Sequence, residues 1–265
     1  MQPYLFGFQS YFMAWMVAAG VGAWTGMRLA RRHGLPLRES FLAWALLSVA
    51  LLIGSKLLYL AEHAIYPLDD PDPLVQASLM GFTWHGFRIP GGMLLLVPAL
   101  PLVCRALGLP VLKFADAMAP SALIGTGVIR IGCFLNGCCF GRLTSGPLGV
   151  SFPRGSRAWE WQYVRGYIPA GAAHALPVVP LQVCFAALGF AGYALGLHWQ
   201  RNKQFDGQVW ANSNLLFFGA TFVLEWFRST PFHLNLILAA SVVVLTALAR
   251  DRLRAWAVAA AHVAS

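Results

Sequence analysis

Long runs of apolar residues recur along the chain, and short clusters of arginine separate them. A helix that crosses a bilayer needs about 20 predominantly apolar residues, and several of these runs have that length. We therefore predict an all-α polytopic membrane protein with seven transmembrane helices. The predicted spans are residues 11–29, 41–60, 90–103, 114–136, 178–198, 209–227 and 232–249.

Basic residues between the apolar runs indicate which loops face the cytoplasm. They lie between the first and second runs, between the third and fourth, between the fifth and sixth, and after the seventh. With seven spans these four groups share one side, which the positive-inside rule identifies as the cytoplasm. We therefore expect the N-terminus outside, the C-terminus in the cytoplasm, and residues 137–177 as a small extracytoplasmic head segment. The acidic stretch 62–80 then also lies outside.

The amino-acid composition supports a membrane location. Hydrophobic residues make up 58% and charged residues 11% of the 265 residues, against about 45–50% and about 25% in soluble domains. These values exclude an ordinary soluble enzyme, a coiled coil and a disordered chain. The net charge of +9 fits cytoplasmic arginines that face anionic lipid, so we expect the lipid bilayer as a partner and no nucleic acid. No internal repeat or linker interrupts the chain, so we expect one membrane domain over residues 1–265.

A second set of charged residues lies within the predicted spans or near their outer ends. A charge at membrane depth is costly and usually faces a cavity or a partner. Arginine holds phosphate through two parallel hydrogen bonds and keeps its charge when desolvated, so several arginines together predict an anion site in the outer half of the bilayer. The alternative is that each side chain extends to the interface or pairs with a carboxylate, as Arg228 would with Glu225. The set comprises Lys56, Arg88, Arg130, Arg142 and Arg228.

Aromatic residues are frequent in the segment 137–177. Because Trp and Tyr concentrate at membrane interfaces, we prefer an interfacial belt for Trp159, Trp161, Tyr163 and Tyr167. The alternative is a small head domain that binds lipid head groups or a peptide substrate.

A long motif begins at the fourth predicted span. Residues 114–153 read FADAMAPSALIGTGVIRIGCFLNGCCFGRLTSGPLGVSFP. This stretch resembles the signature of the prolipoprotein diacylglyceryl transferases, in which F-x-x-D-x-x-x-P precedes G-R-I-G-N-F-I-N-G-E, G-R-x-T and G-V-x-F-P. The matching residues are Phe114, Asp116, Pro120, Arg130, Ile131, Gly132, Phe134, Asn136, Gly137, Gly141, Arg142, Thr144, Gly149, Val150, Phe152 and Pro153. Weaker similarities are found at Tyr11, at Gly91 and Gly92, and at residues 180–182 and 225–228.

The resemblance implies an enzyme. Members of this family move the diacylglyceryl group of phosphatidylglycerol to a cysteine thiol in a preprolipoprotein signal peptide, and glycerol phosphate is released. They are multi-pass proteins of the bacterial inner membrane with the N-terminus outside, and the reaction requires no cofactor and no metal. By this resemblance we expect catalytic roles for Arg130, Arg142 and Tyr11. Cys133 is a further catalytic candidate, because it follows Arg130 by three residues. The residues expected to bind the phospholipid head group are Arg130, Asn136, Gly141, Arg142, Arg88, Gln182, Glu225 and Arg228.

Several motif positions depart from the family pattern. Pro90 stands where the family has the His of His-Gly-Gly, Cys133 where it has Asn, and Cys138 where it has Glu. Thr221 replaces a family arginine. These departures leave two alternatives open: a related membrane protein with a different acceptor, and a non-catalytic phospholipid-binding protein. His85 is a candidate base close to position 90, although a location at the membrane interface is the preferred interpretation.

Three cysteines follow the signature arginine. Cys133 comes three residues after Arg130, so on a helix its sulfur should lie near the guanidinium group, which favours the thiolate. We prefer structural roles for Cys133, Cys138 and Cys139, as packing residues or in a disulfide that an oxidising compartment allows, over nucleophilic catalysis. Three thiols without a fourth ligand nearby fall short of a structural zinc site. The remaining cysteines are expected to be buried packing residues: Cys104 and Cys184.

Overall fold

The computed structural model describes residues 4–5, 8–65, 87–229 and 233–263. The chain divides into two compact units: unit 1 comprises Met1–Leu29 and Ala115–Ser265, and unit 2 comprises Ala30–Phe114. The expectation of one membrane domain stays a prediction. Most of the acidic stretch, the candidate base His85 and the first residue of the predicted seventh span lie outside the described residues.

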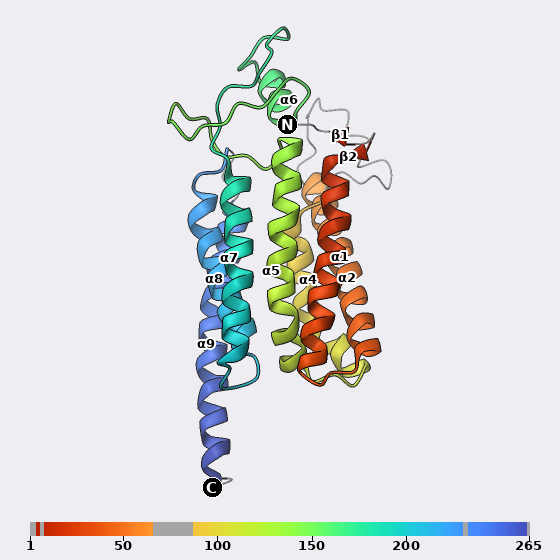
Figure 1. The fold of residues 1–265 in the computed structure, drawn as a ribbon. Helices are drawn as coiled ribbons and strands as arrows, with labels where there is room; N and C mark the ends of the chain where they lie inside the picture. Colours follow the sequence, from red (N-terminus) through yellow and green to blue (C-terminus); the bar gives the residue numbers. More distant parts are fainter. Residues whose placement is uncertain (1–3, 6–7, 66–86, 230–232, 264–265) are drawn as a thin grey trace. The chain divides into compact units, whose positions relative to one another are not determined.

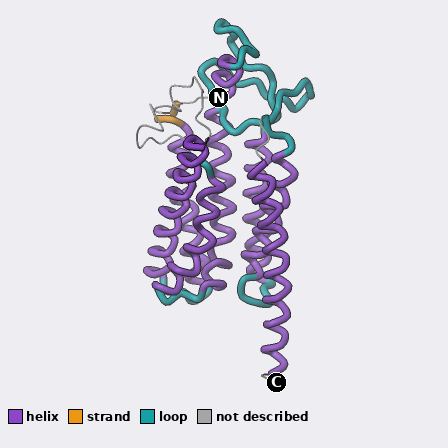
Figure 2. The backbone as a smooth tube through the Cα atoms, turned by 180° about the vertical axis from the view of Figure 1, so that it is seen from behind, coloured by secondary structure: helices purple, strands orange, loops and turns teal. Residues whose placement is uncertain are grey.

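Helices dominate the described residues, and short loops join most of them (Figure 2). In chain order along Figure 1 they are α1 (Ser10–Arg32), α2 (Leu37–Ile65), α4 (Ile89–Ala106), α5 (Val111–Asn136), α6 (Arg157–Val164), α7 (Leu181–Arg201), α8 (Gln208–Glu225) and α9 (His233–Val263). Two short strands, β1 (Tyr4–Leu5) and β2 (Phe8–Gln9), form an antiparallel pair. Among the described helices, α2, α4, α5 and α7 are long and apolar enough to cross a membrane. The prediction of a helical membrane protein is therefore supported, while the count of seven spans stays a prediction.

Two predicted spans have different boundaries in the structure. The prediction starts the fifth span at Val178, but α7 begins at Leu181. The backbone of Val178 instead pairs with that of Val150 through two hydrogen bonds of 3.0 and 3.1 Å. The prediction ends the sixth span at Phe227, but α8 ends at Glu225, because the Phe227 carbonyl accepts a hydrogen bond from the segment after α5. Composition alone does not separate apolar residues that line a head segment from those that face lipid.

The last helix is longer than predicted. The prediction ends the seventh span at residue 249, whereas α9 continues to Val263. Residues 250–263 contain neither Gly nor Pro, and their alanines and arginines favour a helix. The apolar run therefore ends well before the helix does. The first four predicted spans agree with α1, α2, α4 and α5 to within a few residues at each end.

In unit 2, α2 and α4 pack against each other at very short range. A Cβ atom on Gly91 or Gly92 would collide with the α2 backbone, so this close approach depends on the missing side chains. The backbone N–H of Arg88 donates to the Ser55 carbonyl at 2.9 Å, and Arg88 Nε pairs with Glu62 Oε2 at 2.7 Å. The glycine pair that resembles a family motif therefore has a packing role here.

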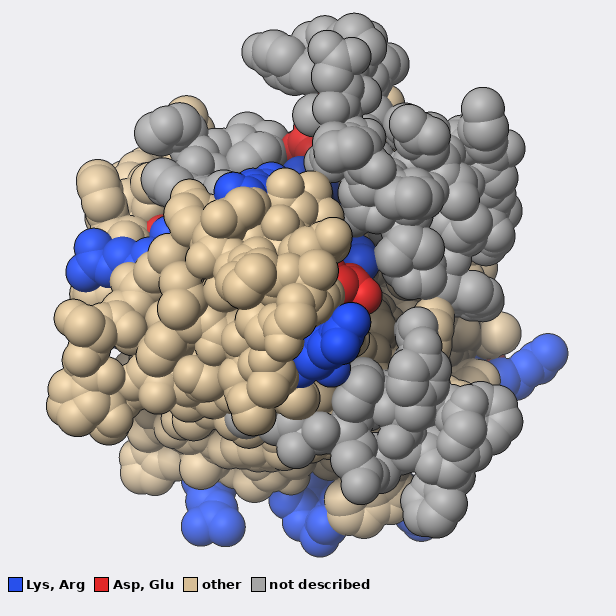
Figure 3. All heavy atoms as spheres, turned by 90° about the horizontal axis from the view of Figure 1, so that it is seen from above, with Lys and Arg blue, Asp and Glu red and all other residues tan. Residues whose placement is uncertain are grey.

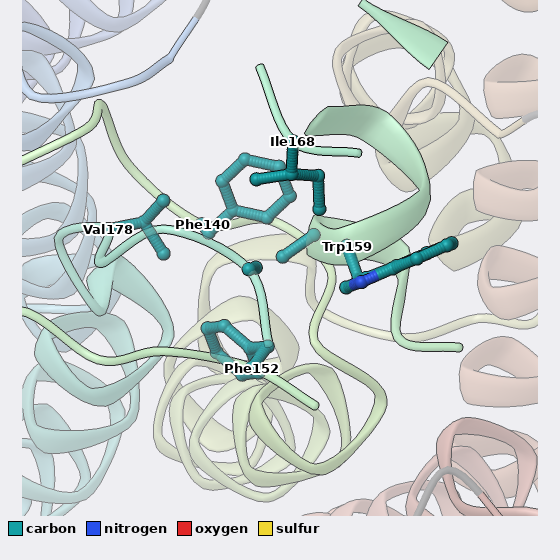
Figure 4. Close-up of a cluster of buried hydrophobic side chains, with 7 residues drawn as sticks. Phe140, Phe152, Trp159, Ile168 and Val178 are labelled. Carbon is teal, nitrogen blue, oxygen red and sulfur yellow. The ribbon is translucent and has the colours of Figure 1, made fainter. Parts of the chain in front are cut away.

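In unit 1, the head segment between α5 and α7 has its own hydrophobic core (Figure 4). Helix α6 begins after Ser156, whose hydroxyl accepts a hydrogen bond from the Trp159 N–H at 3.3 Å. Trp159 is only 7% exposed, and its Nε1 donates to the Ala172 carbonyl at 2.8 Å. The interfacial interpretation is therefore wrong for Trp159, which fills the core of the head. The core comprises Phe140, Phe152, Ala158, Trp159, Ile168, Ala175 and Val178.

Asp116 joins α5 to the start of α8. It is fully buried, and its carboxylate accepts hydrogen bonds from the backbone N–H groups of Gly207 and Trp210 at 2.8 and 2.9 Å. The first N–H groups of a helix have no acceptor within that helix. The Asp116 carboxylate is the acceptor for two of these groups at the start of α8. Lys203 Nζ lies 3.2 Å from the same carboxylate and 2.8 Å from Asp206. Burial alone would lower the pKa of Lys203, but these carboxylates outweigh it and raise the pKa above its ordinary value.

Candidate active site

A tight turn at the end of α5 brings the second cysteine back to the first. Gly137 has a positive φ of 68°, and its N–H donates to the Phe134 carbonyl at 3.2 Å. The Cys138 N–H donates to the Cys133 carbonyl at 3.0 Å. This pair of bonds is a Schellman motif, which satisfies the last carbonyls of a helix. A Cβ atom on Gly137 would lie 2.9 Å from Ser156 Cβ, so glycine is required both for the conformation and for space.

The turn gathers three thiol groups in one place. The sulfur atoms of Cys133, Cys138 and Cys139 all lie within 4.8 Å of one another. Cys133 is buried, Cys138 is half-buried and Cys139 is the most exposed of the three. All five cysteines are free thiols, so the expected disulfide is not formed in this structure. Cys184 corrects a second expectation, because it lies exposed on α7 instead of in a core.

Positive charge surrounds the thiol cluster. Arg130 interacts electrostatically with all three thiols, and Arg228 with that of Cys139. The pKa of Cys139 lies well below its ordinary value, because the Cys133 and Cys138 thiols donate hydrogen bonds to its thiolate and the two arginines attract it. The prediction that the Cys133 sulfur lies near Arg130 is therefore confirmed.

Arg130 projects from α5 toward α7. Its guanidinium carbon lies 4.6 Å from the centroid of the Phe185 ring, in a cation–π contact. Arginine that stacks on an aromatic ring keeps N–H donors at the edge of its plane. Tyr11 of α1 interacts with Arg130 and with the three thiols, so the structure brings together three of the four expected catalytic residues: Tyr11, Arg130 and Cys133.

Arg142, the fourth of these, is held by backbone pairing. Its N–H donates to the Phe227 carbonyl at 2.8 Å, and the Gly141 N–H donates to the Val179 carbonyl at 2.8 Å. Gly141 also forms an antiparallel bridge with Arg228. A Cβ atom on Gly141 would lie 2.6 Å from the Phe227 oxygen, so glycine permits this close approach. The Arg142 guanidinium then lies over the Phe227 ring, 5.2 Å from its centroid.

Glu225 and Arg228 form a tight ion pair at the end of α8. Arg228 Nε and Nη2 donate to the two carboxylate oxygens of Glu225 at 2.8 and 2.6 Å. Glu225 is only 2% exposed, and a buried carboxylate requires such a partner. The expected pairing of these two residues is confirmed. The ion pair therefore fixes the direction of the Arg228 guanidinium group, which brings positive charge to the thiol cluster.

Gln182 connects the first turn of α7 to the cysteine turn. It is fully buried, and its Nε2 donates to the Cys138 carbonyl at 2.7 Å. Its Oε1 atom has no partner among the described residues, and the same holds for the buried Oγ1 of Thr221. Asn136, at the last position of α5, is half-buried. Arg88 belongs to unit 2, so its participation stays a prediction.

Two aromatic residues of the site were not apparent from the sequence, and neither was the backbone conformation of Cys139. Phe185 and Phe227 lie under the two arginines, but phenylalanine is frequent in membrane helices and carries no distinguishing signal. Cys139 belonged to no family position, yet its sulfur completes the cluster. The backbone of Cys139 has a φ of 60°. Among the described residues, Cys139 is the one residue other than glycine that has a positive φ.

Membrane-length helices, together with arginines fixed beside a thiol cluster, define a polytopic helical membrane protein with a candidate anion site. The surface in Figure 3 is mostly uncharged where it is described, with separate Lys and Arg side chains. A family model described as prolipoprotein diacylglyceryl transferase matches residues 4–251. The chain belongs to this family, and the resemblance predicted from the motif is confirmed.

Similar proteins from several bacteria carry the family name. The phosphatidylglycerol–prolipoprotein diacylglyceryl transferase 2 of Clostridium perfringens is 27% identical over 230 residues, which cover 86% of this chain and 82% of the relative. The transferase of Clostridium tetani is 25% identical over 86% of this chain and 84% of its own length. That of Idiomarina loihiensis is 29% identical over 86% of this chain and 78% of its own length.

Proposed function

We propose that this protein transfers the diacylglyceryl group of phosphatidylglycerol to the lipobox cysteine of a preprolipoprotein signal peptide, with release of glycerol phosphate. Family membership supports this reaction, as do the names of the relatives. The observation that carries the proposal is the placement of Arg130, stacked on Phe185 and next to three thiols. Fixed arginines suit an anionic donor, and the thiol acceptor follows from family membership.

The arginines act on the donor. Arg130 and Arg142 bind the phosphate of phosphatidylglycerol, and the ion pair with Glu225 holds Arg228 beside them. Negative charge grows on the leaving phosphate oxygen as the bond to the glycerol carbon breaks. Donors that are fixed in advance stabilise this charge more in the transition state than in the ground state. Gln182 and Gly141 contribute by holding the backbone of the cysteine turn and of Arg142.

The acceptor must react as a thiolate. Its sulfur forms a bond to the glycerol carbon that carried the phosphate ester, and the electron pair of the broken C–O bond leaves with glycerol phosphate. The thiol proton passes to solvent, so the products are the thioether, glycerol phosphate and one proton. The arginines around the site favour the anionic sulfur. The diacylglyceryl chains remain in the hydrocarbon region beside the helices.

We place the protein in the inner membrane of a bacterium, as a multi-pass protein with seven spans, the N-terminus outside and the C-terminus in the cytoplasm. Four helices of membrane-spanning length support this location, and arginine-rich loops on one side support the orientation. The head segment then lies on the outer side, where it meets phosphatidylglycerol and the signal peptide.

A defined reaction mixture tests the proposal. Purified protein is incubated with phosphatidylglycerol and a lipobox peptide, and mass spectrometry detects the thioether product and glycerol phosphate. A peptide with Ser in place of its Cys is the matched control and should give no product. Release of glycerol phosphate without a peptide product would instead favour a different acceptor, which Cys133 and Cys138 at family positions support as the second candidate. Retained lipid without either product would favour a phospholipid-binding protein.

A further inference from the structure

The proposed transfer leaves the thiol cluster without a role. We infer that Cys133, Cys138 and Cys139 bind a zinc ion, and that its fourth coordination position is open to the acceptor thiol. The identity of the fourth ligand rests on the proposed function. The three protein ligands do not, because they follow from the arrangement of the cysteines alone.

The positions of the sulfur atoms fit a single tetrahedral ion. Zn–S bonds of about 2.3 Å at a tetrahedral angle place sulfur atoms about 3.8 Å apart. The three sulfurs here are all within 4.8 Å of one another, so side-chain adjustments of about 1 Å or less close the site. Thiolate ligands select zinc and other soft metal ions over magnesium or calcium.

The backbone around the cluster is shaped to direct its sulfurs inward. The Schellman turn at Gly137 returns Cys138 to Cys133, and Gln182 fixes the Cys138 carbonyl. Cys139 then adopts a φ of 60°, which costs an L-residue about 1 kcal/mol or more and which glycine would adopt freely. Such local strain concentrates at functional sites. The strain at Cys139 is offset if its sulfur completes a metal site.

The positive charges near the cluster fit a zinc ion that is bound by several thiolates. Three thiolates around Zn²⁺ carry a net charge of about −1, and a fourth thiolate brings it to about −2. Arg130 and Arg228 lie close enough to interact with these sulfurs. They compensate charge that is otherwise costly near the membrane.

A zinc ion that is held by three protein ligands keeps one coordination position open for a reacting group. Structural zinc sites are closed by four protein ligands, whereas catalytic sites keep one position open. Within the described residues, the metal-ligating cluster ends at three cysteines. A thiol that enters the open position loses its proton to solvent, since metal coordination deprotonates a thiol at neutral pH. Zinc thereby supplies the acceptor thiolate, and the metal is neither oxidised nor reduced.

Metal binding is measured first, on the full-length protein in detergent. Bound zinc is quantified after dialysis, and cobalt(II) then replaces it, because thiolate-to-cobalt charge transfer reports sulfur ligands. We expect about one ion per chain, and a loss of affinity of about tenfold or more in Cys133→Ser, Cys138→Ser and Cys139→Ser. Cys184→Ser, which alters an exposed cysteine of α7, should bind like the wild type. Circular dichroism confirms that each variant retains its helices.

The open position is tested with the acceptor. Adding a lipobox peptide to the cobalt protein should raise the charge-transfer absorbance by about one third, as three thiolates become four. The matched peptide with Ser in place of Cys should leave the spectrum unchanged. An unchanged spectrum with the Cys peptide would overturn the open position and leave a purely structural ion.

Zinc binding and thioether formation are measured separately, so either of them can fail while the other is confirmed. Protein from which a chelator has removed the bound zinc, and which still forms the thioether at the full rate, would overturn the role of zinc in activating the acceptor while confirming the transferase. Equal cobalt binding by wild type and the three serine variants would overturn the zinc site itself. Cobalt binding that the Cys peptide alters, without any thioether product, would retain the zinc site and refute the transfer reaction.

Discussion

The guanidinium group of Arg130 stacks on the ring of Phe185, with Cζ 4.6 Å from the ring centroid. Phe185 is only 1% exposed, so its surroundings fix the ring and, through it, the plane of the arginine. The contact joins α5 to α7 and presents the guanidinium edge beside the cysteine turn. The direction of this charge is therefore set before substrate binds.

Replacing Arg130 should remove most of the activity. Truncating one partner of a buried charge-assisted contact costs about 2–5 kcal/mol, so Arg130→Ala should lower kcat/KM by about 30-fold or more. Arg130→Lys should be almost as damaging, since an ammonium group does not form the planar two-point contact with phosphate. Product formation with phosphatidylglycerol measures both. Arg201→Ala, at the exposed end of α7, is the control, and normal turnover by Arg130→Ala would remove this residue from the mechanism.

Phe185 should act as a positioning residue. Phe185→Leu keeps an apolar side chain but removes the ring face, and cation–π contacts contribute about 0.5–2 kcal/mol. We expect kcat to fall by about 2- to 30-fold with little change in lipid binding. Phe190→Leu, which alters a more exposed phenylalanine of the same helix, should retain the rate. An equal decrease in both variants would point to a general effect on α7.

The turn after α5 should tolerate no side chain at Gly137. A residue with Cβ costs about 1 kcal/mol at this positive φ, and here Cβ also meets Ser156 at 2.9 Å. Gly137→Ala should therefore lower the free energy of unfolding by about 2–3 kcal/mol. Gly155→Ala, also at positive φ but with open space around it, should cost only about 1 kcal/mol. Thermal unfolding in detergent compares them, and equal losses would show that the packing contact is unimportant.

Asp116 should contribute more to the free energy of unfolding than Asp206, the other carboxylate near Lys203. Asp116→Ala leaves two buried backbone N–H groups without their acceptor and removes one of the two carboxylates beside Lys203, and we expect a loss of about 2–3 kcal/mol. Asp206→Ala removes a more exposed partner and should cost about 0.5 kcal/mol. Chemical denaturation of the detergent-solubilised variants measures both. Equal stability of the two variants would argue against Asp116 as the link between α5 and α8.

The orientation of the chain is open to a direct test. Arginine-rich loops on one side predict a cytoplasmic C-terminus, so a C-terminal alkaline phosphatase fusion should be inactive and a C-terminal green fluorescent protein should fluoresce. The same reporters after Val164 of α6 should give the reverse result. A C-terminal fusion active only in the periplasm would contradict the odd number of spans.

Features set by neighbouring residues were determined by the sequence itself. The length of each apolar run predicted the helices, since a bilayer imposes a minimum length on any spanning helix. Spacing of three residues placed Cys133 beside Arg130, because such positions share one face of a helix. The same spacing predicted the pair of Glu225 and Arg228, although Arg228 follows the end of α8. The family signature likewise lies mostly in one stretch, from Phe114 to Pro153.

Features that join distant segments were decided only by the tertiary structure. Gln182 bonds to Cys138 across 44 positions, and Asp116 bonds to Gly207 across 91. Val178 forms isolated β-bridges in the head segment although its apolar neighbourhood predicts a span. Hydrophobicity specifies that a side chain leaves water, but not whether lipid, another helix or a head core receives it. That choice depends on packing of the whole chain, and it brings Gln182 and Arg228 to the cysteine turn.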